Sequence, residues 1–338
     1  MDVTRARPTM RDVAALAGVS IKTVSRVVNQ EKDVAGAVRA RVQAAVEQLN
    51  YRHHRGASDL RRQGGRTRAI GVLVQDVAND FSAQLLRAIE DAARHHGLAV
   101  LAGSLDEDPD REQALVADMV SRRIDGLVLV AASRRHDYLR PEQRSGLPLV
   151  FVDRPPVGIE ADSVTVDNAS GVAAAVEHLL DVGHRRIAFV GDLPDIATAR
   201  ARHQGWLHTI RAVGADASLS VLGVRDEEQA RTAVLGLLNS TQPPTALVMG
   251  RNVLTVGAMR ALRQVGAEHR IALVGFDDLP LFDMAAPSVS VVRQDVRQLG
   301  TVAAEMLVAR LAGDTHPPRR VVLQPELIIR ASSDPPVL

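Results

Sequence analysis

The sequence predicts an α/β protein with an N-terminal three-helix head of the helix-turn-helix type, a hinge, and two doubly wound parallel-sheet subdomains. Two observations carry this prediction. Residues 11–30, RDVAALAGVSIKTVSRVVNQ, hold two short stretches of apolar periodicity around one glycine. From residue 69 onward, short runs of Val, Ile and Leu alternate with longer helical patterns.

The head is predicted from apolar spacing and turn chemistry. Gly18 marks the end of the first helix, because glycine enters the left-handed conformation without a side-chain clash. Ser20 is a candidate N-cap of the second helix, its hydroxyl accepting from the amide of Lys22 or Thr23. The residues expected to face inward are Val13, Leu16 and Ala17 in the first helix, Val24, Val27 and Val28 in the second, and Val38, Val42, Ala45, Val46 and Leu49 in a third.

Helix, turn and helix form the geometry that offers a second helix to the DNA major groove, although an ordinary helical hairpin has the same pattern. Charge separates the two interpretations. Residues 1–68 hold 14 Lys and Arg against 6 Asp and Glu, a balance of +8, whereas the whole 338-residue chain has a formal net charge of +1. A basic head on an acidic body indicates that only the head meets a polyanion, which favours DNA binding.

Composition excludes several classes of protein. The chain has no cysteine, so disulfides, thiolate zinc sites and cysteine nucleophiles are excluded. The start MDVTRARPTM has no signal-peptide pattern, and no segment approaches the ~20 apolar residues of a membrane span, so a cytoplasmic protein without membrane contact is expected. No metal site is expected either, because the pairs His53–His54 and His95–His96 are adjacent, and adjacent helical residues do not face one another.

The body is predicted from its apolar runs, which are continuous, as in strands buried on both faces of a parallel sheet. The candidates fall into a first series at 69–74, 98–103, 126–132 and 148–153, and a second at 163–167, 186–192, 219–224, 245–250 and 271–277. Ligands of such sheets bind beyond the carboxyl ends of the strands. The polar residues found there are Asp76, Asn79, Asp153, Arg154, Asp167, Asp192, Asn252, Asp277 and Asp278.

Two other classes of function are weighed against a DNA-binding regulator. An α/β enzyme with a helical appendage would need a nucleotide fingerprint or an activated nucleophile. No GxGxxG or GxxxxGK[ST] follows any strand, so we expect no enzyme activity, no catalytic residues and no cofactor. A sugar-binding transport protein could share the fold of residues 69–338, but it would need a signal peptide and would have no use for a basic helix-turn-helix.

The chain resembles the lactose-repressor (LacI/GalR) family of bacterial transcription regulators. The likeness begins with Asp12–Ala14, Ala17–Ser20, Thr23–Val27 and Asn29, and continues through IGVLVQDVAND, DGLVLV, VFVDR, VTVDN, GHRRIAFVGD, RHQGW and VGFDD in the family's order. The resemblance implies a ligand-responsive, sequence-specific repressor that binds a near-palindromic operator in double-stranded DNA as a homodimer. It also implies an effector domain shaped like the periplasmic sugar-binding proteins.

In the head, the resemblance assigns the recognition helix to residues 21–28. It implies that Ile21, Lys22 and Arg26 read base edges, since a Lys can donate to guanine and an apolar side chain can touch a thymine methyl. For Ile21 the alternative is packing in the core of the head. Positions that bind phosphate or cap helices are matched by Ser20, Thr23, Ser25 and Asn29.

Leu60, preceded by Ala57, matches the hinge leucine of the family. The resemblance implies that two such leucines of a dimer wedge into the minor groove, the alternative being an exposed linker residue. The chain departs from the family pattern at His53, His54 and Ser58 in the hinge, and at Ala35 and Val38, where hydroxyl residues usually cap the third helix and contact phosphate. Fewer phosphate contacts would make binding weaker and less sensitive to salt.

In the body, the resemblance implies that Asp153, Arg202, Asn252 and Asp277 contact a small-molecule effector. Such a set suits a hydroxyl-rich carbohydrate, because Asp and Asn accept and Arg donates. For Asp277 the alternative is a turn cap. If Arg154 and Arg251 also face the cleft, a sugar acid or phosphorylated sugar is favoured over a neutral sugar. The alternative for these arginines is solvation or ion pairing.

The expected domain limits follow from the same alignment of motifs. The helix-turn-helix domain is assigned to residues 1–51, the hinge to 52–66, and the effector and dimerisation domain to 67–338. Within it, subdomain 1 covers about 67–162 and 292–320, and subdomain 2 about 163–291 and 321–332. After the strand RRVVLQPELIIR only ASSDPPVL remains, without the added helix that tetramers of the family often use, so a dimer is expected.

Overall fold

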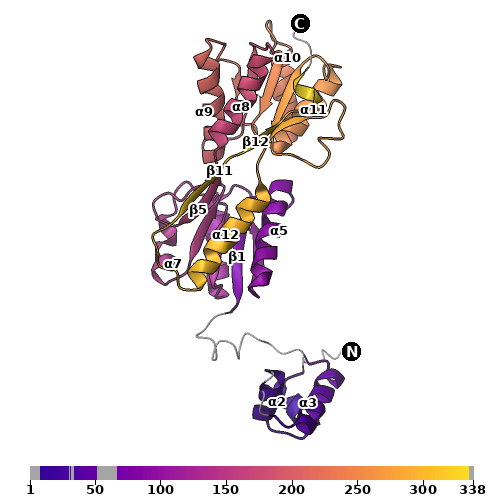
Figure 1. The fold of residues 1–338 in the computed structure, drawn as a ribbon, viewed down its shortest axis with the longest axis vertical. Coiled ribbons are helices and arrows are strands. Elements are labelled where there is room, and N and C mark those ends of the chain that lie inside the picture. Colours follow the sequence, from indigo (N-terminus) through magenta and orange to yellow (C-terminus); the bar gives the residue numbers. More distant parts are fainter. Residues whose placement is uncertain (1–7, 30, 32–33, 52–66, 335–338) are drawn as a thin grey trace. The chain divides into compact units, whose positions relative to one another are not determined.

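A computed structural model describes residues 8–29, 31, 34–51 and 67–334. The chain forms two units, residues 1–67 and 68–338. Each unit has its own buried apolar core. Figure 1 shows the elements of both.

The described residues of the head form three short helices, α1 (Met10–Ala17), α2 (Ile21–Val28) and α3 (Gly36–Gln48). Thr9 and Asp12 form a reciprocal capping box at the start of α1. As predicted, α1 ends at Gly18, whose φ of 64° is left-handed. The core is made of Val13, Ala14, Ala17, Val24, Val27, Val42, Ala45 and Tyr51.

The first subdomain of the body is a six-stranded parallel sheet in the order β11-β5-β4-β3-β1-β2. Helices α5 and α12 cover one face, and α6 with the segment around Leu139 covers the other. The strands are β1 (Ala69–Val74), β2 (Ala99–Ser104), β3 (Gly126–Leu129), β4 (Leu149–Val152), β5 (Asp162–Val166) and β11 (Arg320–Leu323). The helices are α5 (Asp80–His95), α6 (Pro109–Ser121), η1 (Asp137–Leu139), α7 (Arg140–Arg144) and α12 (Val296–Leu311).

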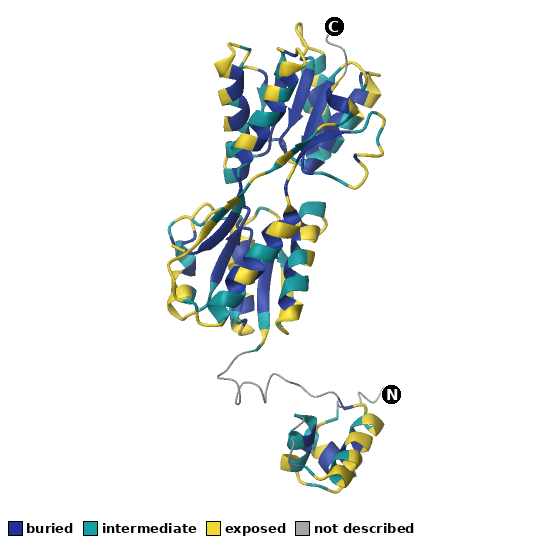
Figure 2. Cartoon of the chain, in the orientation of Figure 1, coloured by how far each residue is buried: buried dark blue, intermediate teal, exposed yellow. Residues whose placement is uncertain are grey.

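The second subdomain repeats this plan in the order β12-β10-β9-β8-β6-β7, with only β12 antiparallel. Its strands are β6 (Ile187–Val190), β7 (Ser220–Val221), β8 (Ala246–Met249), β9 (Ala272–Phe276), β10 (Ser290–Arg293) and β12 (Glu326–Ile328). The inner strands are mostly dark blue in Figure 2 because helices cover them on both sides, whereas the edge strands β7 and β12 are partly exposed. The helices are α8 (Asn168–Asp181), α9 (Ala197–Ala212), α10 (Glu227–Leu238), α11 (Asn252–Gln264) and η2 (Ala331–Ser333).

The structure confirms the α/β class and the two sheets, but it corrects the sheet to which some of the predicted strands belong. The strand predicted at 163–167 in the second subdomain is β5, which pairs with β4 and β11 in the first sheet. The segment predicted as one last strand is divided into β11 and β12, one in each sheet, because Pro325 between them has no N–H to donate to a ladder. Strand β10 was not predicted, and β7 has only two residues of the predicted 219–224.

Strand order reverses between β1 and β3 in one sheet and between β6 and β8 in the other. Chain connections leave the sheet in opposite directions at such a point, which opens a crevice at the carboxyl ends of the strands. The segments that follow β1, β4, β6, β8 and β9 line one cavity between the two subdomains. The topology therefore places polar strand ends of both sheets around a common site.

Candidate functional site

The first candidate surface is α2, whose start is built as predicted. Ser20 is the N-cap: its Oγ accepts from the amide of Thr23 at 3.1 Å, and the two hydroxyl oxygens lie 2.9 Å apart. Two small polar side chains thus stand at the positive end of the α2 dipole, where anions bind favourably. At the other end, Asn29 Nδ2 donates to Ser25 Oγ at 3.2 Å.

Burial separates the inward and outward faces of the helix-turn-helix. Val24 and Val27 are buried, whereas Lys22 is exposed and Ile21 is 46% exposed. Core packing, the alternative for Ile21, is therefore wrong. The prediction of Leu16 as an inward residue is also wrong: it is 45% exposed, and Ala14 takes the inward position because three-to-four-residue spacing alone does not choose between them.

Arg26 makes a contact that spacing could not reveal. Its Nε donates to Glu31 Oε2 at 3.1 Å, and Arg39 Nη2 donates to the Glu31 carbonyl at 2.7 Å. A base contact by Arg26 would require exchange of this ion pair. At α3, the N-cap Ala35 offers no side-chain hydrogen bond, as the sequence indicated. The predicted hinge residues Ala57 and Leu60, with His53, His54 and Ser58, lie outside the described residues.

The second candidate surface is the cleft between the subdomains of the body. All four residues predicted to contact an effector line it: Asp153, Arg202, Asn252 and Asp277. All four are at least nine-tenths buried. The cleft also gathers residues that sequence reasoning did not single out as ligand contacts, namely Gln75, Phe81, Glu107, Thr198 and Gln294.

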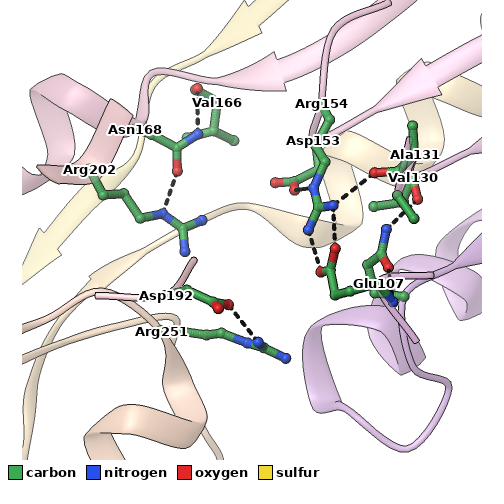
Figure 3. A network of polar contacts seen from close by, with 12 residues as sticks. Glu107, Val130, Ala131, Asp153, Arg154, Val166, Asn168, Asp192, Arg202 and Arg251 are labelled. Carbon is green, nitrogen blue, oxygen red and sulfur yellow. Dashed lines mark hydrogen bonds and ion pairs between the residues drawn. The ribbon is translucent and has the colours of Figure 1, made fainter. Parts of the chain in front are cut away.

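Arg202, on α9, is fixed on three sides. Its Nε donates to Asn168 Oδ1 at 2.6 Å, its Nη1 donates to the Gly250 carbonyl at 2.8 Å, and its Cζ lies 3.7 Å from the centroid of the Phe276 ring. Figure 3 shows the Asn168 contact and the guanidinium directed into the cleft. Burial lowers the pKa of this guanidinium, and the neighbouring carboxylates of Asp277 and Asp153 oppose that shift.

Asp153 and Asp277 occupy equivalent places, each directly after a strand and each with a left-handed backbone, at φ of 66° and 69°. Such a φ is uncommon outside glycine, and it turns each carboxyl toward the cleft. Burial raises the pKa of both carboxyls, while attraction to Arg202 works against the rise. Gln294 Nε2 donates to Asp277 Oδ1 at 2.6 Å. Turn capping does not explain Asp277, since no backbone amide donates to its side chain in the described part of the chain.

Asn252 joins the two subdomains. Its Oδ1 accepts from Asn79 Nδ2 at 3.1 Å, and its Nδ2 donates to Asn79 Oδ1 at 3.3 Å. Asn79 is the N-cap of α5 in the first subdomain, whereas Asn252 begins α11 in the second. This reciprocal amide pair spans the cleft. A ligand that enters or leaves between the two side chains therefore changes the contact between the subdomains.

Arg154 and Arg251 both line the cleft, and both are ion-paired. Arg154 donates to the two carboxylate oxygens of Glu107 at 2.7 and 2.5 Å, and Arg251 donates to Asp192 Oδ2 at 2.7 Å. The two pairs face each other from opposite subdomains in Figure 3. The sequence favours an anionic ligand if three arginines lie in the cleft, and all three do lie there. The arginines are compensated, which spacing in the sequence could not show.

Three buried polar atoms of the cleft have no hydrogen-bond partner within the described residues: Asp153 Oδ1, Gln294 Oε1 and Arg154 Nε. Buried polar groups are almost always paired, so unpaired ones in a cleft mark where a bound molecule supplies the partner. Among the same residues, no cluster of His, Asp and Glu could hold a metal ion, and no helix is long and apolar enough to cross a membrane.

Two family patterns match this chain. The one described as bacterial regulatory proteins, lacI family, covers residues 9–53, and the one described as periplasmic binding protein-like domain covers residues 176–333. The chain is similar to the HTH-type transcriptional regulator PtxS of Pseudomonas aeruginosa, with 32% identity over 336 residues, 98% of this chain and 97% of that protein. It is similar to the ribose operon repressor of Escherichia coli (strain K12), with 30% identity over 330 residues, 96% of this chain and 99% of the repressor.

Solved structures agree with this assignment of the fold. The lac repressor dimer bound to operator and the anti-inducer ONPF matches with a TM-score of 0.83 at 26% identity, over 97% of this chain and 99% of that one. A transcriptional regulator CelR–cellobiose complex matches with a TM-score of 0.70 at 29% identity, over 96% of this chain and 100% of that one.

Proposed function

The chain belongs to the LacI family of bacterial regulatory proteins and is a DNA-binding transcription regulator, not an enzyme. From this premise we propose that it is a repressor that binds a near-palindromic operator as a homodimer and responds to a small carbohydrate held in the cleft of the body. The observation that carries the effector half of this proposal is the set of buried, unpaired acceptor atoms beside Arg202.

The proposed DNA surface is α2 with the residues at its ends. Ile21 and Lys22 are exposed on the first turn of the helix, the part that reaches base edges when a recognition helix enters the major groove. Lys22 would donate to guanine O6 or N7, Ile21 would contact a thymine methyl, and Arg26 would read a further base after leaving Glu31. Phosphate contacts are assigned to Ser20, Thr23, Ser25 and Asn29, and the minor-groove wedge to Ala57 and Leu60.

The proposed effector is a molecule rich in hydroxyl groups. Asp153 Oδ1 and Gln294 Oε1 are buried acceptors without a donor in the described part of the chain, and a hydroxyl can donate to either. Arg202 supplies donors opposite them, and Asp277 and Asn252 complete the set. The E. coli relative is a repressor of the ribose operon, which is consistent with a sugar-sized ligand for this cleft.

The proposed response is a shift between two arrangements of the subdomains. The Asn79–Asn252 pair, 3.1 and 3.3 Å long, links the two subdomains across the cleft in this structure. An effector that binds one arrangement more tightly than the other changes their populations, and the dimer transmits this change to the two heads. Operator affinity then changes by the ratio of the effector's affinities for the two arrangements.

Selection of bound sequences from random duplex DNA, with salt titration, tests the proposal on the intact chain and on Leu60→Ala. An enriched palindrome that the intact chain binds tightly and Leu60→Ala binds much more weakly is the expected result. If no sequence is enriched, with or without pooled sugars and sugar acids in the selection, specific DNA recognition by this chain is refuted. A palindrome bound equally by both proteins would remove Leu60 from the proposed surface.

A further inference from the structure

We propose that two carboxylates of the chain, Glu107 and Asp192, set the charge of the ligand that the cleft accepts. Each neutralises an arginine facing the cleft, so that the site takes an uncharged polyhydroxylated molecule and rejects the acid with the same carbon skeleton. The inference rests on the proposed function, because it concerns the cleft assigned there to the effector.

Glu107 occupies the Nη1–Nη2 edge of Arg154, and the remaining donor nitrogen, Nε, lies 3.8 Å from Asp153 Oδ2 without a hydrogen bond to a described residue. The two carboxylate oxygens accept from Nη1 and Nη2 at 2.7 and 2.5 Å, and the side chains are only 15% and 12% exposed. Arg154 Nη1 also donates to the Ala131 carbonyl at 2.8 Å. A ligand carboxylate binds arginine best through two parallel N–H donors, and this pair of donors is already taken.

Backbone contacts hold Glu107 in this place. Its amide donates to Gln75 Oε1 at 3.0 Å, and Gln75 Nε2 donates to the Val130 carbonyl at 2.7 Å. These contacts tie the segment after β2 to those after β1 and β3, so Glu107 does not depend on Arg154 alone for its position. A ligand anion would have to displace a carboxylate that the fold itself keeps beside the guanidinium.

Asp192 compensates the charge of Arg251 on the other subdomain through a single hydrogen-bonded contact. Its Oδ2 accepts from Arg251 Nη1 at 2.7 Å, and its Oδ1 accepts from the amide of Leu193 at 2.7 Å. The Asp192 side chain is 9% exposed and that of Arg251 is 25% exposed. Both arginines that sequence spacing offered to an anion are thus compensated from within the chain (Figure 3).

The balance of charge and of hydrogen-bonding groups in the cleft also disfavours an anion. Five carboxylates line it, those of Asp76, Glu107, Asp153, Asp192 and Asp277, against the three guanidinium groups of Arg154, Arg202 and Arg251. A buried charge without a partner of opposite charge costs free energy, and an anionic ligand would add to the negative charge that already predominates in the cleft. Two of the three cleft atoms without a hydrogen bond among the described residues, Asp153 Oδ1 and Gln294 Oε1, are acceptors, to which a hydroxyl can donate and a ligand carboxylate cannot. The third, the donor Arg154 Nε, already lies 3.8 Å from the carboxylate of Asp153.

The test is isothermal titration of the intact chain with matched pairs, D-ribose against D-ribonate and D-glucose against D-gluconate, combined with thermal unfolding in gluconate or inorganic phosphate. The variants are Glu107→Gln and Asp192→Asn. Glu160→Gln, which removes a 73% exposed carboxylate on the surface, is the matched control. Unfolding without ligand verifies that each variant is folded, and the second variant carries the test if the first is not.

We expect wild type and Glu160→Gln to gain no stability from the anions. Each cleft variant should bind them about tenfold or more tightly than wild type does, because one guanidinium edge is released. Wild type should bind any sugar that it recognises about tenfold or more tightly than the corresponding acid. The inference is overturned if wild type binds an acid as tightly as its sugar, or if neither folded variant gains affinity for anions. Failure of the proposed function would appear separately, as absence of an enriched operator.

Discussion

Replacing Arg202 with methionine tests whether the centre of the cleft is a charge network rather than ordinary packing. Methionine keeps much of the side-chain volume but removes the donors to Asn168 Oδ1 and the Gly250 carbonyl, 2.6 and 2.8 Å away. It also removes the charge that attracts the buried carboxylates of Asp153 and Asp277. Breaking a buried ionic network in this way costs about 3–5 kcal/mol of unfolding free energy.

For a unit of this size, that cost lowers Tm by about 6–20 °C. Differential scanning calorimetry at pH 7.5 measures it. Arg211→Met is the control, because Arg211 is an exposed residue in the last turn of the same helix, where a favourable dipole contact is worth less than about 1 kcal/mol. A Tm of Arg202→Met equal to that of Arg211→Met would refute the charge network.

The same variant has a signature in pH. Burial raises the pKa of Asp153 and Asp277 in the folded protein, and Arg202 limits the rise. A carboxyl with a raised folded-state pKa contributes stability that is present at low pH and is lost as pH rises through that pKa. Without Arg202 the pKa of both carboxyls rises further. The loss of unfolding free energy in Arg202→Met relative to wild type should therefore shrink as pH falls from about 7 toward 5. A deficit that stays constant or grows contradicts this reasoning.

Four further substitutions test other parts of the structure. Ser20→Ala removes the N-cap of α2 and should cost the head about 1 kcal/mol, seen as weaker operator binding and earlier unfolding by circular dichroism. Gly205→Ala would place a Cβ 2.3 Å from the Ala169 carbonyl and should therefore destabilise the body. Gly236 lies in a helix with open space around it, so Gly236→Ala should stabilise the body by about 0.5–1 kcal/mol. Equal Tm values for the two variants would contradict this description of the packing. Glu112→Gln alters a fully buried carboxylate that accepts from two loop amides and a tyrosine hydroxyl, and should cost about 1–3 kcal/mol in urea unfolding; an unchanged midpoint would show that the loop does not need it.

Local patterns predicted the parts of this molecule that local chemistry decides. The end of α1 at Gly18 and the start of α2 after Ser20 follow from one glycine and one hydroxyl. The strand from Ala69 to Val74 was predicted to the residue because both of its faces are buried and its apolar run is unbroken. The four residues proposed to contact the effector were assigned from the family resemblance, and the structure brings them together in one cleft.

Contacts between distant segments were not predictable in the same way. The pairing of β5 with β11 joins residues about 157 positions apart, and nothing in either run specifies its partner. The Glu107–Arg154 and Asp192–Arg251 pairs depend on how loops of one subdomain converge. Leu16 was misplaced because a helix of eight residues offers too few turns for spacing to define one face.

The central claim is that one chain couples a ligand in its cleft to recognition of an operator by its head. Fluorescence anisotropy of the selected operator, titrated with the intact chain with and without a bound sugar, tests it most directly. We predict a ligand-dependent change in operator affinity of about 5–150-fold, which Asp277→Asn should abolish without altering affinity in the absence of ligand. A sugar that binds the cleft and leaves operator affinity unchanged would contradict the claim.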